Sequence, residues 1–219
     1  MIAHYDPPGG REAMLRLGPD DAPLAIVALP PFEEANRTRT FAVTIMRALA
    51  DRGIASALPD LPGTNDSLVA TEDATLEAWR TAFAIAAETT TAVTSIAIRG
   101  GALIDSAAAL AGRWHLAPQP GAMLVRELDR IRDAGGGAGD ESVVEIAGNR
   151  LSRHLLGEIG AAKPSEVGTR VVRFDTDAQP ADLKVAGSPL WRRAEPDNDV
   201  ALAERLADDI AAWVRSCAG

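Results

Sequence analysis

The sequence has one cysteine, few aromatic residues, a deficit of basic residues and no long apolar run. With Cys217 as its only thiol, this chain of 219 residues cannot form an intrachain disulfide, which fits a reducing cytoplasm. Hydrophobic residues make up 47% of the chain but aromatic ones only 4%, so we expect a core of Ala, Leu, Ile and Val. The 22 basic and 31 acidic residues give a net charge of -9, which argues against a nucleic-acid-binding protein.

Several targeting and cofactor patterns are also missing. Residues 1–23 lack the basic start and apolar run of a signal peptide. No apolar stretch approaches the roughly 18 residues that span a bilayer. Three dispersed histidines give no metal-ligand spacing, and the Gly-x-Gly-x-x-Gly dinucleotide motif is absent. We therefore expect a cytoplasmic protein with no direct membrane span, no metal and no cofactor.

Strand and helix patterns alternate along most of the chain. An edge hairpin is predicted within residues 5–17. Apolar and β-branched runs predict strands at 24–29, 54–58, 94–98, 114–117, 169–174 and 183–187. Apolar residues at helical spacing predict helices at 38–52, 75–88, 102–111, 122–134, 151–161 and 199–215. This order predicts a single α/β domain with a doubly wound, mostly parallel sheet. Residues 121–161 form a small helical cap insertion in this prediction, with a flexible glycine-rich connector at 135–139.

The turn after the predicted strand at 94–98 contains the most informative residue. Arg99, Gly100 and Gly101 follow that strand directly, and Ala97 and Gly101 place a small residue two positions before and after Arg99. In an α/β-hydrolase, such a strand–turn–helix holds the nucleophile between two small residues. A guanidinium stays protonated and cannot attack a carbonyl, so serine chemistry is excluded at this turn.

The other parts of a serine-hydrolase site are incomplete as well. No Gly-x-Ser-x-Gly occurs, and the loop at 187–196, where the base would lie, contains no histidine. The acid position is filled, because Asp175 and Asp177 follow the strand at 169–174. For the three histidines, a structural or exposed role is favoured over a catalytic one; they are His4, His115 and His154.

Serine and aspartate side chains elsewhere have ordinary explanations. Ser67 closes a turn-rich loop and is expected to tie that turn down. Ser106 and Asp105 fall on the predicted helix at 102–111, where Asp105 is expected to be a solvated or capping charge.

The loop after the strand at 24–29 would supply an oxyanion-hole donor in a hydrolase. It begins with two prolines, which lack the N–H donor, so Phe32 is left to provide one. Glu33, Glu34 and Asn36 follow. Two interpretations stay open: these acids favour the N-terminus of the next helix, or Glu34 forms an ion pair with Arg99 in a remodelled pocket.

Two interpretations also stay open for Arg99 itself. A cation at a helix N-terminus opposes the helix dipole, so a partner such as Glu34, Asp60 or Asp175 is expected nearby. Alternatively, the guanidinium binds an anionic ligand such as a carboxylate, phosphate or sugar acid, and backbone N–H groups at the helix start add donors. The candidate ligand-binding residues are Arg99, Gly100, Gly101, Phe32, Glu34, Asn36 and Trp191.

Four blocks of sequence resemble a known family. They are Pro31-Phe-Glu-Glu-Ala-Asn-Arg37, Asp60-Leu-Pro-Gly-Thr-Asn-Asp-Ser67, Val144-Glu-Ile-Ala-Gly-Asn-Arg-Leu-Ser152, and Ser188-Pro-Leu-Trp191 followed by Glu195. Together and in this order, they resemble the second type of exosortase A system-associated hydrolase. The first block is one residue shorter than in that family, and Thr64-Asn65 replaces Cys-Gly. The resemblance implies an α/β-hydrolase fold, an arginine at the elbow as a family trait, and a bacterium that exports exopolysaccharide.

These observations predict a hydrolase-family protein without serine-hydrolase activity. The predicted ligand is a small anionic, acyl or glycosyl molecule, or the protein binds a partner of the exopolysaccharide and exosortase system. A homodimer is a further predicted assembly. The alternative is an active hydrolase with a non-standard site, in which Arg99 stabilises an oxyanion and Glu34 or Asp175 acts as the base.

Overall fold

The computed structural model describes residues 1–135, 142–193 and 197–219. The predicted α/β fold is confirmed: an eight-stranded sheet has the order β1-β2-β4-β3-β5-β6-β9-β10. The antiparallel edge hairpin consists of β1 (Ile2–Tyr5) and β2 (Glu12–Leu17). The remaining strands are parallel to one another: β3 (Leu24–Ala28), β4 (Ala55–Pro59), β5 (Thr94–Ile98), β6 (Gly112–Leu116), β9 (Thr169–Phe174) and β10 (Leu183–Val185).

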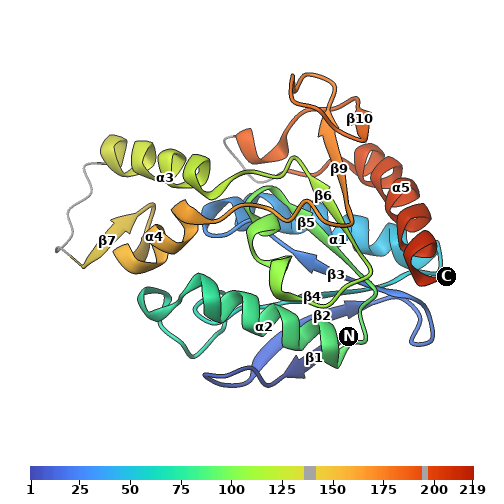
Figure 1. Ribbon diagram of the computed structural model, residues 1–219, viewed down its shortest axis with the longest axis horizontal. Coiled ribbons are helices and arrows are strands. Elements are labelled where there is room, and N and C mark those ends of the chain that lie inside the picture. The colour runs from blue at the N-terminus through green and yellow to red at the C-terminus, as the bar shows by residue number, and fades with distance from the viewer. Residues whose placement is uncertain (136–141, 194–196) are drawn as a thin grey trace.

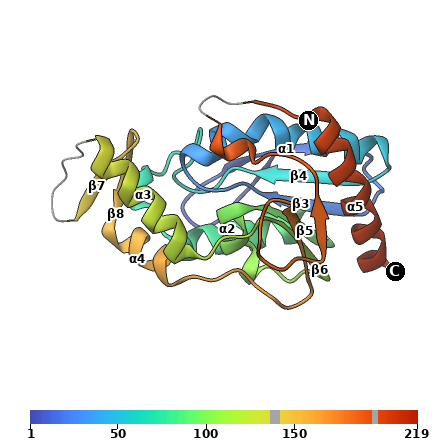
Figure 2. The same ribbon diagram turned by 90° about the horizontal axis from the view of Figure 1, so that it is seen from above.

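Helices cover both faces of this sheet (Figures 1 and 2). Because side chains alternate along a strand, Ile26 of β3 packs in the core on one face and Val27 in the core on the other. The Val27 core includes the apolar sides of α1 (Glu33–Asp51) and α5 (Val200–Ala218), and the Ile26 core includes that of α2 (Leu76–Thr89). All three helices were predicted, although α1 begins at Glu33 and the prediction began it at residue 38.

The segment predicted as a cap contains two helices and a hairpin. Helices α3 (Gly121–Gly135) and α4 (Arg153–Ala161) were predicted, whereas the antiparallel pair β7 (Val143–Ile146) and β8 (Asn149–Ser152) was not. Together they extend the molecule at one end (Figures 1 and 2). The connector predicted at 135–139 lies outside the described residues after Gly135.

The prediction of a helix at 102–111 is wrong. Two short 3-10 turns, η2 (Arg99–Leu103) and η3 (Asp105–Ala107), follow β5, and the chain then runs irregularly into β6. This connection must return along the whole of β5, because Gly112 pairs with Thr94. A 3-10 turn rises about 2.0 Å per residue against about 1.5 Å for an α-helix, so it spans that distance with fewer residues.

Two other 3-10 turns follow strands of the sheet. The turn η1 (Thr71–Asp73) lies in the connection after β4, and η4 (Leu190–Arg192) lies in the connection after β10. Among the helices in the described ranges, none combines the length and the apolar character needed to cross a bilayer.

Candidate functional site

Arg99 has the backbone conformation of a nucleophile elbow. Its φ of 54° lies in the left-handed region, which few residues other than glycine adopt. The turn is pressed against the loop after β3: a Cβ on Gly101 would lie 2.3 Å from the Ala28 carbonyl oxygen, and one on Gly100 3.0 Å from Pro31. The two glycines are therefore required by close packing, and the turn has the shape of an elbow with an arginine at its tip.

Three side chains hold the Arg99 guanidinium. Its Nη2 donates to Glu34 Oε1 at 3.3 Å and to Glu127 Oε2 at 3.0 Å, and its Cζ lies 5.2 Å from the centre of the Trp191 ring. Both interpretations left open for Glu34 hold, because it lies in the first turn of α1 and also pairs with Arg99. Glu127 of α3 was not anticipated. Of the other expected partners, Asp60 pairs with Arg39, and Asp175 is exposed.

Burial sets the electrostatics of this cluster. It raises the pKa of Glu34 above its usual 4.5, and the attraction of Arg99 only partly offsets that rise. Gln119 donates from Nε2 to Glu127 Oε2 at 2.9 Å, and this bond holds the Glu127 carboxylate in position beside Arg99. A guanidinium held by two carboxylates and an aromatic ring serves mainly as a structural cross-link between the elbow, α1, α3 and η4.

A cleft of about 300 Å³ opens above Arg99, between the start of α1 and helix α3. Its apolar wall includes Leu124, Leu128 and Ile131 of α3, with Phe32 and Trp191 opposite. Arg130 and Arg192 also line the cleft, and both are exposed. Within the described ranges neither has an ion-pair partner, so the cleft combines apolar walls with two available cations.

The acid position is filled, but its carboxylate is engaged elsewhere. Asp177 Oδ2 accepts from Arg173 Nη1 at 2.8 Å, and its Oδ1 accepts from the Gln179 N–H at 2.9 Å. Burial alone would raise the pKa of Asp177, yet these bonds outweigh burial and lower it. Arg173 and Asp177 line a second hollow beside Arg99.

The histidines lie apart from the elbow. His4 is exposed on β1, and His154 on α4 is exposed with its Nε2 3.7 Å from Glu158. His115 is fully buried on β6. In the described part of the chain, no cluster of three or more His, Cys, Asp or Glu side chains is arranged for a metal. Ser67 ties its turn together as expected, because its Oγ accepts from the Gly63 N–H at 3.0 Å.

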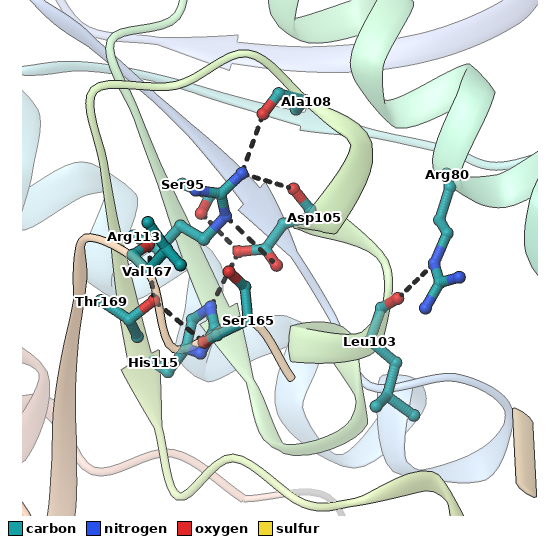
Figure 3. A network of polar contacts seen from close by, with 10 residues as sticks. All are labelled: Arg80, Ser95, Leu103, Asp105, Ala108, Arg113, His115, Ser165, Val167 and Thr169. Carbon is teal, nitrogen blue, oxygen red and sulfur yellow. Dashed lines mark hydrogen bonds and ion pairs between the residues drawn. The ribbon is translucent and has the colours of Figure 1, made fainter. Parts of the chain in front are cut away.

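Sequence reasoning missed a buried polar network that joins β5, η3 and β6 (Figure 3). Asp105 Oδ2 accepts from Ser95 Oγ at 2.6 Å and lies 2.8 Å from His115 Nε2. Arg113 Nη2 donates to the carbonyl oxygens of Asp105 and Ala108 at 3.3 and 2.9 Å. Asp105 is 0% exposed, so the expectation of a solvated or capping charge is wrong.

This network has the residue types of a catalytic triad but not its order. In a triad the histidine lies between serine and aspartate and removes the serine proton, whereas here both Ser95 and His115 bond to the aspartate. All three are buried, so substrate cannot reach Ser95. The sequence contained one indication of this network. Arg113 and His115 are two residues apart, which puts both side chains on the same face of β6.

The remaining predicted residues divide between two places. Phe32 lines the cleft above Arg99 and has a φ of 62°. Its ring contacts Trp79 at 5.7 Å between centroids. Asn36 instead lines a separate cavity on the other side of Phe32. Gly100 and Gly101 start only a 3-10 turn of five residues, so a helix N-terminus does not support anion binding there.

Comparison with known proteins shows the fold. No family model matches this sequence, and no curated protein matches it significantly. Solved structures do match. Est1E from Butyrivibrio proteoclasticus, solved with ferulic acid, has a TM-score of 0.70 and 14% identity over 98% of this chain and 99% of that one. A thermophilic esterase from Thermogutta terrifontis, solved with malate, has a TM-score of 0.54 and 15% identity, with 99% of both chains covered.

A third similar structure has another chemistry. An AqdC variant in complex with its substrate, the Pseudomonas quinolone signal whose ring it cleaves, has a TM-score of 0.62 and 10% identity, over 99% of this chain and 100% of that one. Identities this low establish the fold alone, and one fold supports many functions. This chain has the α/β-hydrolase fold.

Proposed function

We propose that this protein has lost serine-hydrolase catalysis and binds a small anionic ligand with an acyl or glycosyl body in the cleft above Arg99. The observation that carries the proposal is the residue at the elbow, where Arg99 is held between Glu34 and Glu127. Serine chemistry needs a nucleophile there and a histidine beside it, and neither is present among the described residues of this cleft.

The charge of the ligand is argued from the rim of the cleft. Arg99 is already neutralised by two carboxylates, so it contributes little to a further anion. Arg130 and Arg192 have no such partners in the described ranges and line the cleft, where a guanidinium suits carboxylates and phosphates. The apolar side chains of α3 would contact the body of the ligand.

The biological setting of the proposal comes from sequence. The four blocks between residues 31 and 195 support a role beside the exopolysaccharide and exosortase system of a bacterium, with the ligand or a protein partner drawn from that system. Co-purification of the tagged protein from such a bacterium tests this. Recovery of the same proteins with an Arg130→Gln/Arg192→Gln variant would place their binding outside the cleft.

Two measurements test the loss of activity and the ligand class. A panel of fluorogenic esters should show no turnover above the Arg99→Ala variant. Octanoate or glucuronate should raise the Tm of the wild type, whereas 1-octanol and glucose should not. Arg130→Gln and Arg192→Gln should reduce the shift, and Arg126→Gln, an exposed position on the same helix outside the cleft, should preserve it.

The alternative function, an active hydrolase with a non-standard site, is favoured by one observation. A buried carboxyl whose pKa is raised, such as that of Glu34, is a candidate general base. Ester turnover that disappears in both Glu34→Gln and Arg99→Ala would establish this alternative and overturn our proposal.

A further inference from the structure

A second cavity lies behind the wall formed by Pro31 and Phe32, which line both it and the cleft above Arg99. Its volume is about 280 Å³. It is enclosed by the end of β3, the first turns of α1 and the loop that follows β4. Arg99 does not line it, so a ligand bound here would not contact the Arg99 side chain.

The inner walls are apolar and already fixed in position. Leu58, Phe83 and Ile104 are buried and line the cavity. Trp79 lines it as well, and its indole Nε1 donates to the Pro62 carbonyl oxygen at 2.8 Å, which fixes the orientation of the ring. With Phe32 tilted against Trp79, the walls offer preformed aromatic surface, which favours a flat ring as the ligand body.

Among the described residues that line this cavity, Arg39 is the only charged one. Its Nη1 and Nη2 approach Asp60 Oδ1 at 3.4 and 3.3 Å, longer than the roughly 2.7–2.9 Å of a strong charge-assisted bond. The same oxygen is held more closely by Asn65 Nδ2 at 2.6 Å. The Arg39 side chain is 38% exposed, so its N–H fork is loosely engaged and accessible.

A carboxylate can join this pair without displacing Asp60. Arg99 shows the same arrangement in this molecule, with one guanidinium between two carboxylates. Asn36 and Thr64 also line the cavity and add neutral hydrogen-bonding groups. Arg39 therefore favours a negatively charged head group on the ligand, and the aromatic walls favour an apolar body.

We propose that this second cavity is a binding site for a compact aromatic carboxylate, with the ring against the aromatic surface that Phe32 and Trp79 form together and the carboxylate on Arg39. The size agrees, because a cavity of about 150 Å³ is enough for benzene and this one is nearly twice as large. The proposal goes beyond the function of the elbow cleft and does not depend on it.

Titration of the purified full-length protein with benzoate and 3-phenylpropanoate, followed by ligand-observed NMR, tests this site. We expect saturable binding of both acids, and binding of benzamide and benzyl alcohol at least tenfold weaker. Arg39→Gln should weaken benzoate binding about tenfold or more. Arg47→Gln, an exposed position on the same helix, and Arg130→Gln in the elbow cleft should leave it unchanged.

A cavity-filling variant locates the ring independently of charge. Ala35 lines the cavity on the first turn of α1, and Ala35→Leu should abolish binding of the acids, with a melting curve showing that the variant is folded. Equal affinity for benzoate and benzamide, unchanged benzoate binding in Arg39→Gln, or no saturable binding of any probe would each overturn the proposal.

Discussion

Arg99 has a left-handed backbone conformation. The turn around it is fixed by the packing of Gly101 against Ala28, not by the Arg99 side chain. Arg99→Ser would therefore restore the missing hydroxyl in the nucleophile position. It should still produce no esterase, because His115 is buried against Asp105 and His154 is exposed on α4. A fluorogenic ester assay checks this. Turnover above that of Arg99→Ala would show that some other group can act as the base.

The raised pKa of Glu34 has a consequence for stability at the scale of one residue. In the folded protein its carboxyl retains a proton at pH values above 4.5 where the unfolded chain has released it. Stability must therefore fall as pH rises from about 4.5 through the higher folded pKa. Glu34→Gln should flatten that fall, because Arg99 keeps Glu127 as its partner.

Urea unfolding at several pH values from 4.5 upwards measures this slope. Glu33→Gln, a change in the neighbouring carboxylate that pairs with Arg37, should retain the wild-type slope because Glu34 is still in place. An unchanged slope in Glu34→Gln would assign the pH dependence to another group.

Asp105 should be one of the most sensitive buried positions. Asp105→Asn removes the negative charge beside Arg113, whose Nε lies 3.9 Å from Asp105 Oδ1, and leaves that cation uncompensated in the interior. Losing one partner of a buried pair costs about 3–5 kcal/mol, so we expect a loss of that order in urea unfolding. The exposed control Asp133→Asn should change stability by less than about 0.5 kcal/mol; a similarly small effect at Asp105 would contradict this account.

At the scale of elements, the contact of α3 with α4 depends on a glycine. A Cβ on Gly121 would lie 1.6 Å from the Ile159 carbonyl oxygen, so Gly121→Ala must push the two helices apart. Overpacking costs about 1–3 kcal/mol, and a Tm lower by roughly 2–10 °C is expected. Gly157→Ala on α4 meets open space and should be neutral or slightly stabilising. Similar melting temperatures for both variants would mean that the helices separate at little cost.

The elements that could be predicted from sequence are those with a clear period. Helix α5 has apolar residues at helical spacing, and β3 is a short apolar run rich in β-branched residues between turn residues. The segment 102–111 misled because alanine favours a helix locally, whereas the return of the chain to the start of β6 and the burial of Asp105 are long-range constraints. The β7–β8 hairpin was missed because its strands are short and only partly apolar.

The same distinction applies to the candidate site. Arg99 could be recognised because its position is defined by adjacent residues, and Glu34 because it lies at the start of α1, directly after the loop that faces the elbow. Glu127 is 28 residues away on the inserted segment, and nothing local indicates that α3 brings it back to Arg99. The second cavity likewise joins Arg39 to Trp79 and the loop after β4, which no local motif reveals.

At the scale of the whole molecule, Asp209 connects α5 to the sheet. It accepts from Trp114 Nε1 of β6 at 2.8 Å and from Arg170 Nη2 of β9 at 2.7 Å. Burial alone would raise the pKa of Asp209, but these bonds outweigh it and lower the pKa below 3.8. Its carboxylate therefore stabilises the fold above about pH 4, and this contribution is lost as pH falls through the lower folded pKa.

Asp209→Asn should accordingly reduce stability by about 1.5–3 kcal/mol at neutral pH, and the difference from the wild type should shrink below about pH 4. Urea unfolding at neutral and acidic pH measures both. Asp208→Asn changes the neighbouring carboxylate, which is 71% exposed and pairs with Arg52, so about 1 kcal/mol or less is expected. A difference at Asp209 that persists at low pH would assign the effect to packing.

The left-handed turn at Arg99 has a consequence for how members of this fold are found. Its shape is held by glycines and by the backbone of a neighbouring loop, so the turn does not depend on a serine at its tip. Surveys that look for a serine between two glycines will pass over such chains. Surveys that look for one residue with positive φ at the end of a central parallel strand would recover them together with the serine-bearing members of the fold.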